Sequence, residues 1–254
     1  YMTKSKSYKW VFTTRFRTNA YSWKASKLAC KRIKEAVSEI KKVARKDSMV
    51  GAEGAIKLME KLWPALQHVD SSSGALGTAV YNAINVLVDI VVDAPADKKA
   101  RSRWLDRLWK AINEDGVGFL DSLGERWGDV CGSADIASQW ADNFLPIIHR
   151  TWDETKQDSF SYFLGTLPCL SCLLVAGRFQ ELLTLLETAP YLSWDYRKYG
   201  VEALFTMGKK MEAINYAKTS CGLNDNPIAI DRACERILLS SGLYEEAYEQ
   251  YGLT

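Results

Sequence analysis

The sequence predicts an all-α protein, an α-solenoid of stacked antiparallel helix pairs. Two observations support this prediction. Through most of the chain, apolar residues recur at steps of three and four, which is the spacing of one face of an α-helix. In the last third, three similar segments centred on glycines indicate a helix pair that repeats. A short β or extended segment is expected only near the N-terminus, where aromatic residues alternate approximately from Tyr8 to Phe12.

The composition bounds the class of protein. The 254 residues, 47% hydrophobic and 25% charged, suffice for one elongated repeat domain or two compact ones and exclude a disordered chain. The longest apolar stretch, residues 83–92, is interrupted by Asn85 and Asp89 and reaches half of the roughly 20 residues that a membrane-spanning helix requires, so no membrane partner is expected. No signal peptide is visible, and the six scattered cysteines are predicted to be reduced in the cytoplasm.

Charge is distributed unevenly along the chain. Residues 1–46 contain 14 Lys and Arg against two acids, Glu35 and Glu39, whereas the remainder has a net charge of −10. The basic part is therefore expected either to contact the acidic remainder or to bind an external anion.

The first half of the chain shows helical spacing in order. A helix is predicted from about residue 20 to 46, followed by one over residues 55–66 that Pro64 kinks or restarts. A serine-rich loop at residues 69–74 separates it from a helix over 75–93 that is apolar on most sides, as in a helix buried between neighbours. The apolar stripe of the first helix consists of Ala29, Ile33, Ala36, Ile40 and Val43.

Three more helices are predicted before residue 150. Asp97 caps a helix whose apolar stripe spans residues 104–112, and Gly116 ends it. A short helix follows around residues 119–127. Ser133 then opens a helix that extends to about residue 148.

The last third repeats one short pattern. Residues 176–182, 207–213 and 241–247 align without gaps, and their glycines are 31 and 34 residues apart. Each glycine follows a leucine by four places and precedes a glutamate by four. The glycines are Gly177, Gly208 and Gly242, and the glutamates are Glu181, Glu212 and Glu246.

The pattern has a physical explanation. A helix ends at a glycine because the residue after the last turn adopts a left-handed conformation that strains other residues. The next helix begins within a few residues, so the two helices lie antiparallel. Each pair leaves an apolar face that only the next pair can bury, which predicts a stack.

This pattern resembles the tetratricopeptide repeat, at the turn between its two helices and the start of the second, over residues 166–254. The tryptophan usual in the first helix of that repeat is absent, and Thr166 and Arg197 stand at the corresponding places. The resemblance implies a curved array whose concave face binds a protein or peptide. The whole chain also resembles a group of bacterial proteins without an assigned activity, which implies no function.

Three parts are therefore predicted. They are a basic, aromatic segment 1–19, a helical-hairpin region 20–158 and tetratricopeptide-like repeats 159–254, which are expected to continue beyond the end of this chain.

No residue pattern indicates an enzyme, a metal or a cofactor. Cys169 and Cys172 form the only C-x-x-C pair, but no second ligand pair accompanies it, and burial on a helix is the favoured interpretation over metal or redox chemistry. His68 and His149 have no triad partners nearby and are interpreted as solvated or helix-capping residues.

The basic N-terminal residues suggest a second function. Lysines and arginines neutralise phosphates and aromatic rings stack on exposed bases, so their interleaving suits single-stranded nucleic acid. Core aromatics beside a solvated basic face are the alternative interpretation. The candidate contacts are Lys9, Trp10, Arg15, Arg17, Lys31, Lys34 and Lys41. We expect a non-enzymatic protein-interaction or scaffolding module, with nucleic-acid binding through residues 1–46 as the alternative.

Overall fold

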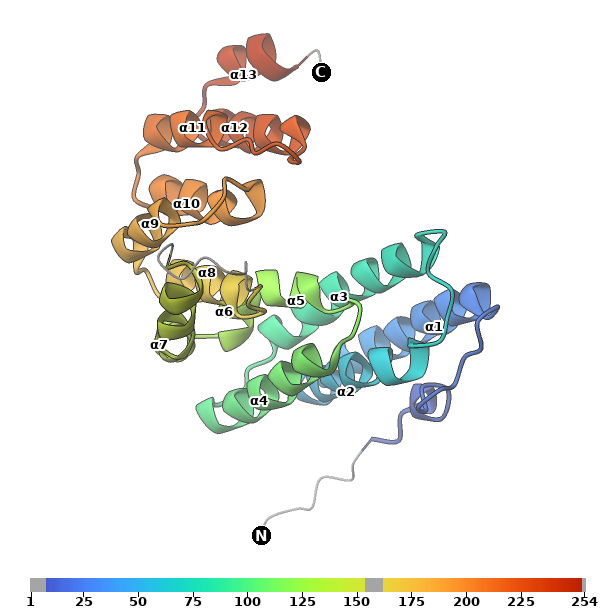
Figure 1. Cartoon of the computed structure of the whole chain (residues 1–254). Helices are drawn as coiled ribbons and strands as arrows, with labels where there is room; N and C mark the ends of the chain where they lie inside the picture. Colours follow the sequence, from blue (N-terminus) through green and yellow to red (C-terminus); the bar gives the residue numbers. More distant parts are fainter. Residues whose placement is uncertain (1–7, 154–161, 253–254) are drawn as a thin grey trace. The chain divides into compact units, whose positions relative to one another are not determined.

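The computed structural model describes residues 8–153 and 162–252, and these contain thirteen α-helices, one 3₁₀ helix and no β-strand (Figure 1). The all-α prediction is confirmed. The chain divides into two compact units, Tyr1–Gly132 and Ser133–Thr254. The predicted boundary between residues 158 and 159 lies outside the described residues, and the predicted repeat segment belongs to the second unit.

The first unit is a bundle around three long helices. Helices α1, α2 and α3 each pack against the other two, α4 packs against α2 and α6, and both α5 and α6 pack against α3. The elements are η1 (Val11–Thr14), α1 (Ser26–Ala44), α2 (Ser48–Leu66), α3 (Ala75–Asp93), α4 (Lys98–Glu114), α5 (Asp121–Glu125) and α6 (Trp127–Cys131).

Sequence spacing explains which faces of these helices are buried. The buried residues of α1 are Ala29, Ile33, Ala36 and Ile40, all on the predicted stripe. Helix α2 begins earlier than its apolar stripe, at Ser48, because the Asp47 carboxylate accepts a hydrogen bond from the backbone N–H of Val50 at 3.0 Å. It continues through Pro64, whose carbonyl accepts a hydrogen bond from the backbone N–H of Asn19 in the N-terminal segment at 2.8 Å.

The N-terminal segment differs from the strand considered for it. Trp10 is extended, but the next four residues form η1, because the Glu39 carboxylate accepts hydrogen bonds from the backbone N–H groups of Val11 and Phe12. Trp10, Phe12 and Phe16 are buried, with 5%, 2% and 1% of their surface exposed. The alternation of aromatic residues from Tyr8 to Phe12 thus reflects a packed aromatic cluster and not a strand. Residues 1–7 lie outside the described part.

Helix α3 contacts four other helices of this unit. Among the described residues it is also the one helix long and apolar enough to cross a membrane by length and composition. The core helix of a folded unit meets the same criterion, and α3 contacts α1, α2, α5 and α6.

The second unit is a succession of neighbouring helices, each packed on the next along the chain (Figure 1). Helix α10 additionally contacts α8, so the first helices of two successive pairs touch. The elements are α7 (Ala134–Thr151), α8 (Thr166–Val175), α9 (Phe179–Glu187), α10 (Trp194–Thr206), α11 (Lys210–Lys218), α12 (Pro227–Ser240) and α13 (Tyr244–Tyr251).

Three turns of the same geometry join the pairs α8/α9, α10/α11 and α12/α13. Gly177, Gly208 and Gly242 have φ of 72°, 79° and 77°, in the left-handed region. The residue after each glycine donates its backbone N–H to a leucine carbonyl five positions back, which is the Schellman arrangement of hydrogen bonds. These bonds are Arg178 to Leu173 at 2.9 Å, Lys209 to Leu204 at 2.9 Å and Leu243 to Leu238 at 3.0 Å.

The residues after each turn start the second helix in the same way. In the first turn of the second helix of each pair, one small or apolar residue is buried. These residues are Leu182, Ala213 and Ala247. The preceding glutamates, Glu181, Glu212 and Glu246, lie in the first turn and are exposed. A carboxylate there interacts favourably with the positive end of the helix dipole. The described helices therefore pack in neighbouring pairs, an arrangement compatible with a helical-repeat fold.

We predict that Gly208→Ala lowers the free energy of unfolding by about 1–2 kcal/mol, because alanine is strained at positive φ. A Cβ at Gly208 would meet no atom within 4 Å, so the cost is conformational. Gly208→Asn should cost less, since asparagine tolerates this region. Urea denaturation followed by circular dichroism measures both.

Gly77→Ala is the matched control. Gly77 lies inside α3 and also has open space around it, so alanine there should stabilise the fold by about 0.5–1 kcal/mol. Equal effects of the two alanine substitutions would contradict the role assigned to the turn.

Candidate functional site

Helix α1 separates its acidic side chains from most of its basic ones. The Glu35 carboxylate accepts hydrogen bonds from Arg15 at 2.5 Å and from Arg32 at 2.7 Å. Glu39 caps η1, as described above. The hydrogen bond from Arg32, then the charges of Arg32 and Arg15, lower the pKa of Glu35 against the opposing effect of desolvation. Both acids of residues 1–46 are thus engaged by the N-terminal segment or by Arg32.

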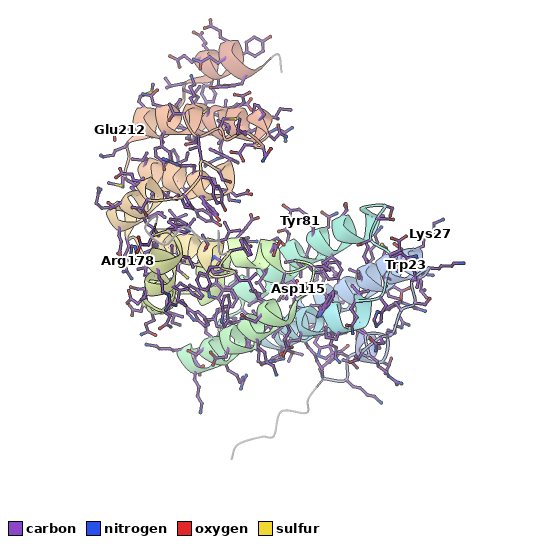
Figure 2. The ribbon with its side chains drawn as sticks, in the orientation of Figure 1. Trp23, Lys27, Tyr81, Asp115, Arg178 and Glu212 are labelled. Carbon is purple, nitrogen blue, oxygen red and sulfur yellow. The ribbon has the colours of Figure 1, made fainter. Side chains whose placement is uncertain are left out.

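Seven other cations on or beside α1 form what we call the basic face. Its side chains are all exposed, and within the described residues none forms an ion pair. Positions 27, 31, 34, 41 and 45 follow steps of four, three, seven and four, so they share one side of α1 over about 27 Å. Figure 2 shows Lys27 and the exposed Trp23 at the same end of α1. The basic face consists of Lys24, Lys27, Lys31, Lys34, Lys41, Lys42 and Arg45.

A groove runs between α1 and α3 beside this face. Its volume is about 420 Å³, and no acidic or aromatic residue lines it. We call it the α1–α3 groove. Its floor is apolar, formed by Ile33, Val37, Ala79, Ala83 and Val86. Its rim is polar and mostly cationic, formed by Lys34, Ser38, Lys41, Lys42, Arg45 and Asn82.

A second hollow continues the basic surface toward the start of α1. It has a volume of about 890 Å³ and shares Lys34 with the α1–α3 groove. Lys24, Lys27 and Lys31 line it, together with Cys30 and Glu35. Because Lys34 lines both hollows, the basic surface is continuous along α1.

The predicted nucleic-acid contacts separate into two groups. Lys31, Lys34 and Lys41 lie on the basic face, exposed and close to the groove. Lys9 and Arg17 are exposed on the N-terminal segment, and Arg15 is paired with Glu35. Trp10 is 5% exposed, with its ring against Gly54, and it lines a cavity together with Lys57, Lys61, Arg103 and Arg107. Little of the ring is therefore exposed for a base to stack on, and its role as a nucleic-acid contact stays a prediction.

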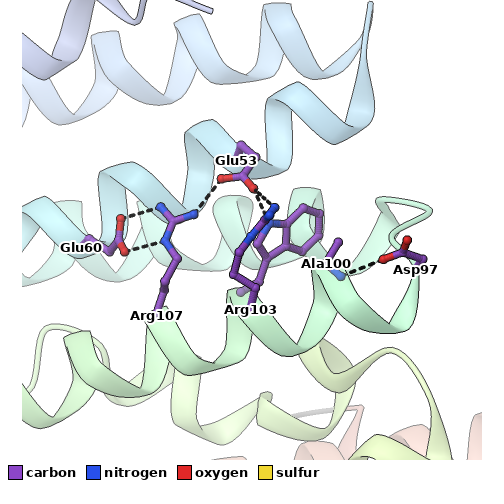
Figure 3. Close-up of polar contacts among 7 residues, drawn as sticks. Glu53, Glu60, Asp97, Ala100, Arg103 and Arg107 are labelled. Atoms are coloured by element: carbon purple, nitrogen blue, oxygen red, sulfur yellow. Dashed lines mark hydrogen bonds and ion pairs between the residues drawn. The ribbon is translucent and has the colours of Figure 1, made fainter. Parts of the chain in front are cut away.

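A polar network that sequence analysis did not predict joins α2 to α4 (Figure 3). The Glu53 carboxylate accepts hydrogen bonds from the Trp104 indole at 2.7 Å, from Arg103 at 2.8 Å and from Arg107 at 2.7 Å. The Arg107 guanidinium also donates two hydrogen bonds to Glu60, at 2.8 and 2.7 Å. Glu53 and Glu60 are seven residues apart, so they lie two turns apart on one face of α2. That spacing is the feature of the sequence that could have indicated the network.

The network is best explained as a structural clamp. Desolvation raises the pKa of Glu53, but hydrogen bonds from Trp104 and Arg107 and the charges of Arg107 and Arg103 outweigh it, so the net pKa is lowered. The carboxylate is held ionised between cations, and such a group is a poor proton acceptor for catalysis. A neighbouring cavity of about 680 Å³ is lined by Glu53, Glu60, Arg103, Arg107 and residues of the N-terminal segment.

The cysteine pair and the two histidines considered for chemistry lie in different environments. Cys169 and Cys172 are buried in α8, and burial raises the pKa of the Cys169 thiol to about 12, so it stays protonated. His68 and His149 are exposed near the C-terminal ends of α2 and α7. Within the described residues, no three His, Cys, Asp or Glu side chains are grouped to hold a metal ion.

Comparisons of the chain with protein-family models, with curated proteins and with solved structures found no match. The site is therefore assigned from its own geometry. The basic face and the α1–α3 groove beside it are the strongest candidate, because they combine exposed unpaired charge with accessible apolar surface.

We predict that Glu53→Gln lowers the free energy of unfolding by about 1 kcal/mol at neutral pH, since the charge that Arg107 and Arg103 compensate is lost. The folded-state pKa of Glu53 lies below its unfolded value, so its contribution is present above the unfolded pKa and disappears as pH falls through the folded one. The difference between variant and wild type should shrink as the pH falls below the ordinary range of a glutamate, measured by urea denaturation at several pH values.

Glu114→Gln is the control, because the Glu114 carboxylate is exposed and its ion pair with Lys110 is long, at 3.7 Å. It should change stability by less than about 0.5 kcal/mol at any of these pH values. An equally large loss in Glu114→Gln would show that the effect of Glu53→Gln is not specific to the network.

Proposed function

We propose that this chain is a non-enzymatic protein-interaction or scaffolding module of the tetratricopeptide-like helical-repeat type. The observation that supports it best is the set of three turns with the same backbone geometry, each joining two helices that pack together. The first helices of two successive pairs, α8 and α10, also pack against each other, as expected when helix pairs stack into an array that can bind an extended partner.

The proposed location is the cytoplasm. All six cysteines are free thiols, including the buried Cys131, Cys169, Cys172 and Cys234. A secreted protein commonly uses cysteines in disulfides, whereas a reducing compartment keeps them as thiols. The thiol state of the purified protein, measured by alkylation before exposure to air, checks this point.

A second candidate function is nucleic-acid binding through the basic face. The specific observation in its favour is a row of exposed cations along α1 that have no ion-pair partner among the described residues. Such a row can neutralise successive phosphates without reading bases. Because Trp10 is buried, this candidate rests on the exposed cations of the basic face and not on that ring.

We predict that crosslinking of the full chain in its native cells, followed by affinity capture, recovers a defined protein partner. The partner should remain after nuclease digestion, because the contact is between proteins. Recovery of no protein partner, together with turnover of a small molecule by the purified chain, would overturn the proposed function.

For the second candidate, the association constant with a DNA oligonucleotide should fall linearly with salt on a double logarithmic plot, measured by fluorescence anisotropy. Lys31→Glu/Lys34→Glu/Lys41→Glu should weaken binding by at least about tenfold and make the slope shallower by roughly three phosphate contacts. Lys98→Glu/Lys99→Glu, on exposed residues at the start of α4, is the control and should bind as wild type. Absence of binding at low salt would remove this candidate.

A further inference from the structure

The α1–α3 groove has an apolar floor that the protein itself leaves accessible. Ile33 and Ala83 are buried, whereas Val37, Ala79 and Val86 are only half-buried. Ala79 and Ala83 are one turn apart on α3, and their small side chains let another backbone approach closely. Further burial of the floor would remove apolar surface from water at about 25 cal/mol per Å².

The side chains of the rim give the groove a net positive charge. Lys34, Lys41 and Arg45 stand on the α1 side, and the α3 side contributes the neutral Asn82. No carboxylate lines the groove, and the rim cations form no ion pair among the described residues. An occupant that buries the floor would come to lie beside these cations, and negative charge on that side of the occupant would be favoured.

The spacing of the rim matches a helix. From Lys34, two of the other rim cations, Lys41 and Arg45, lie seven and eleven residues on, which is two and three helical turns. A second helix that runs along the groove can present carboxylates at the same spacing. The stretch from Ile33 to Arg45 is about 18 Å long and accommodates roughly three turns of such a helix.

We infer that the α1–α3 groove binds an acidic amphipathic helix of a partner protein. The apolar stripe of the partner helix covers the floor at Val37, Ala83 and Val86. The carboxylates of the partner helix face Lys34, Lys41 and Arg45. This inference rests on the proposed function and names the surface and the chemistry of its partner. The binding mode is a helix in a groove, with apolar anchors at helical spacing and charges that set orientation.

Nucleic acid fits the groove less well than such a helix. A phosphate backbone would use the rim cations but would gain nothing from the apolar floor. Bases stack on aromatic rings, and no aromatic side chain lines the groove. The apolar floor is therefore the feature that distinguishes the two occupants.

The test uses the full chain and a fluorescent synthetic peptide of about four helical turns, with a leucine stripe and glutamates along one flank. Anisotropy should show saturable binding to wild type, and a scrambled peptide of the same composition should bind at least about tenfold more weakly. Lys34→Glu/Lys41→Glu should weaken binding of the amphipathic peptide by roughly tenfold. Lys98→Glu/Lys99→Glu is again the matched charge control and should bind as wild type.

A substitution that adds a positive charge to the floor distinguishes an acidic helix from nucleic acid as the occupant of the groove. Val37→Lys places a cation on the apolar floor, so it should weaken binding of the acidic peptide by at least about tenfold. The affinity for DNA should stay unchanged or increase. Val86→Lys is the second floor variant, on the facing helix, and should behave in the same way. Circular dichroism spectra and unfolding midpoints identify which floor variants keep the wild-type fold, and those variants decide the outcome.

Two results would overturn the inference. One is binding of DNA but not of the amphipathic peptide, which would favour the second candidate function. The other is peptide binding that the floor variants leave unchanged. If affinity capture still recovers a protein partner with Val37→Lys as bait, the groove assignment fails while the proposed interaction function stands. If capture recovers no partner with wild type and the purified chain turns over a small molecule, the proposed function itself fails.

Discussion

The structure depends on one constraint: each helix has an apolar stripe that only neighbouring helices can remove from water. Fully burying an aliphatic side chain contributes about 1.5–3 kcal/mol, whereas a surface ion pair contributes about 0–1 kcal/mol. Packing of the stripes therefore determines which helices meet, and charged residues adapt to the surfaces that remain. In the first unit α3, apolar on most sides, packs against both α1 and α2. In the second unit the same need is met by successive neighbours along the chain, joined by turns at Gly177, Gly208 and Gly242.

This constraint also produces the candidate site. One face of α1 is buried against α2 and α3, and the N-terminal segment covers the flank that carries Glu35 and Glu39. The acids accept hydrogen bonds there, and the neighbouring cations of the basic face form no ion pair among the described residues. The α1–α3 groove arises where α3 presents small side chains, Ala79 and Ala83, beside that cationic side. Apolar floor and basic rim are thus two consequences of how α1 packs.

The comparison of sequence with structure is informative residue by residue. The stripe of α1 and the caps at Asp97 and Ser133 are as expected, since helical spacing and capping involve residues within four positions of one another. The sequence shows that residues 8–17 are basic and aromatic, but it does not show which of their side chains are buried. Trp10 packs against Gly54, a residue 44 positions away, and no local pattern indicates that contact.

By itself, the sequence determined the helical class, most of the helix positions and the places where the chain must reverse, because periodicity, capping and a left-handed glycine act over a few residues. Only the tertiary structure decided which charges are neutralised. Glu53 and Glu60 meet Arg107 across α2 and α4, and Glu39 meets the N–H groups of η1, at separations of 27 to 54 residues. Whether a lysine is free or paired depends on such long-range neighbours, which is why the sequence located a basic region and the fold selected the face of it that is available to a partner.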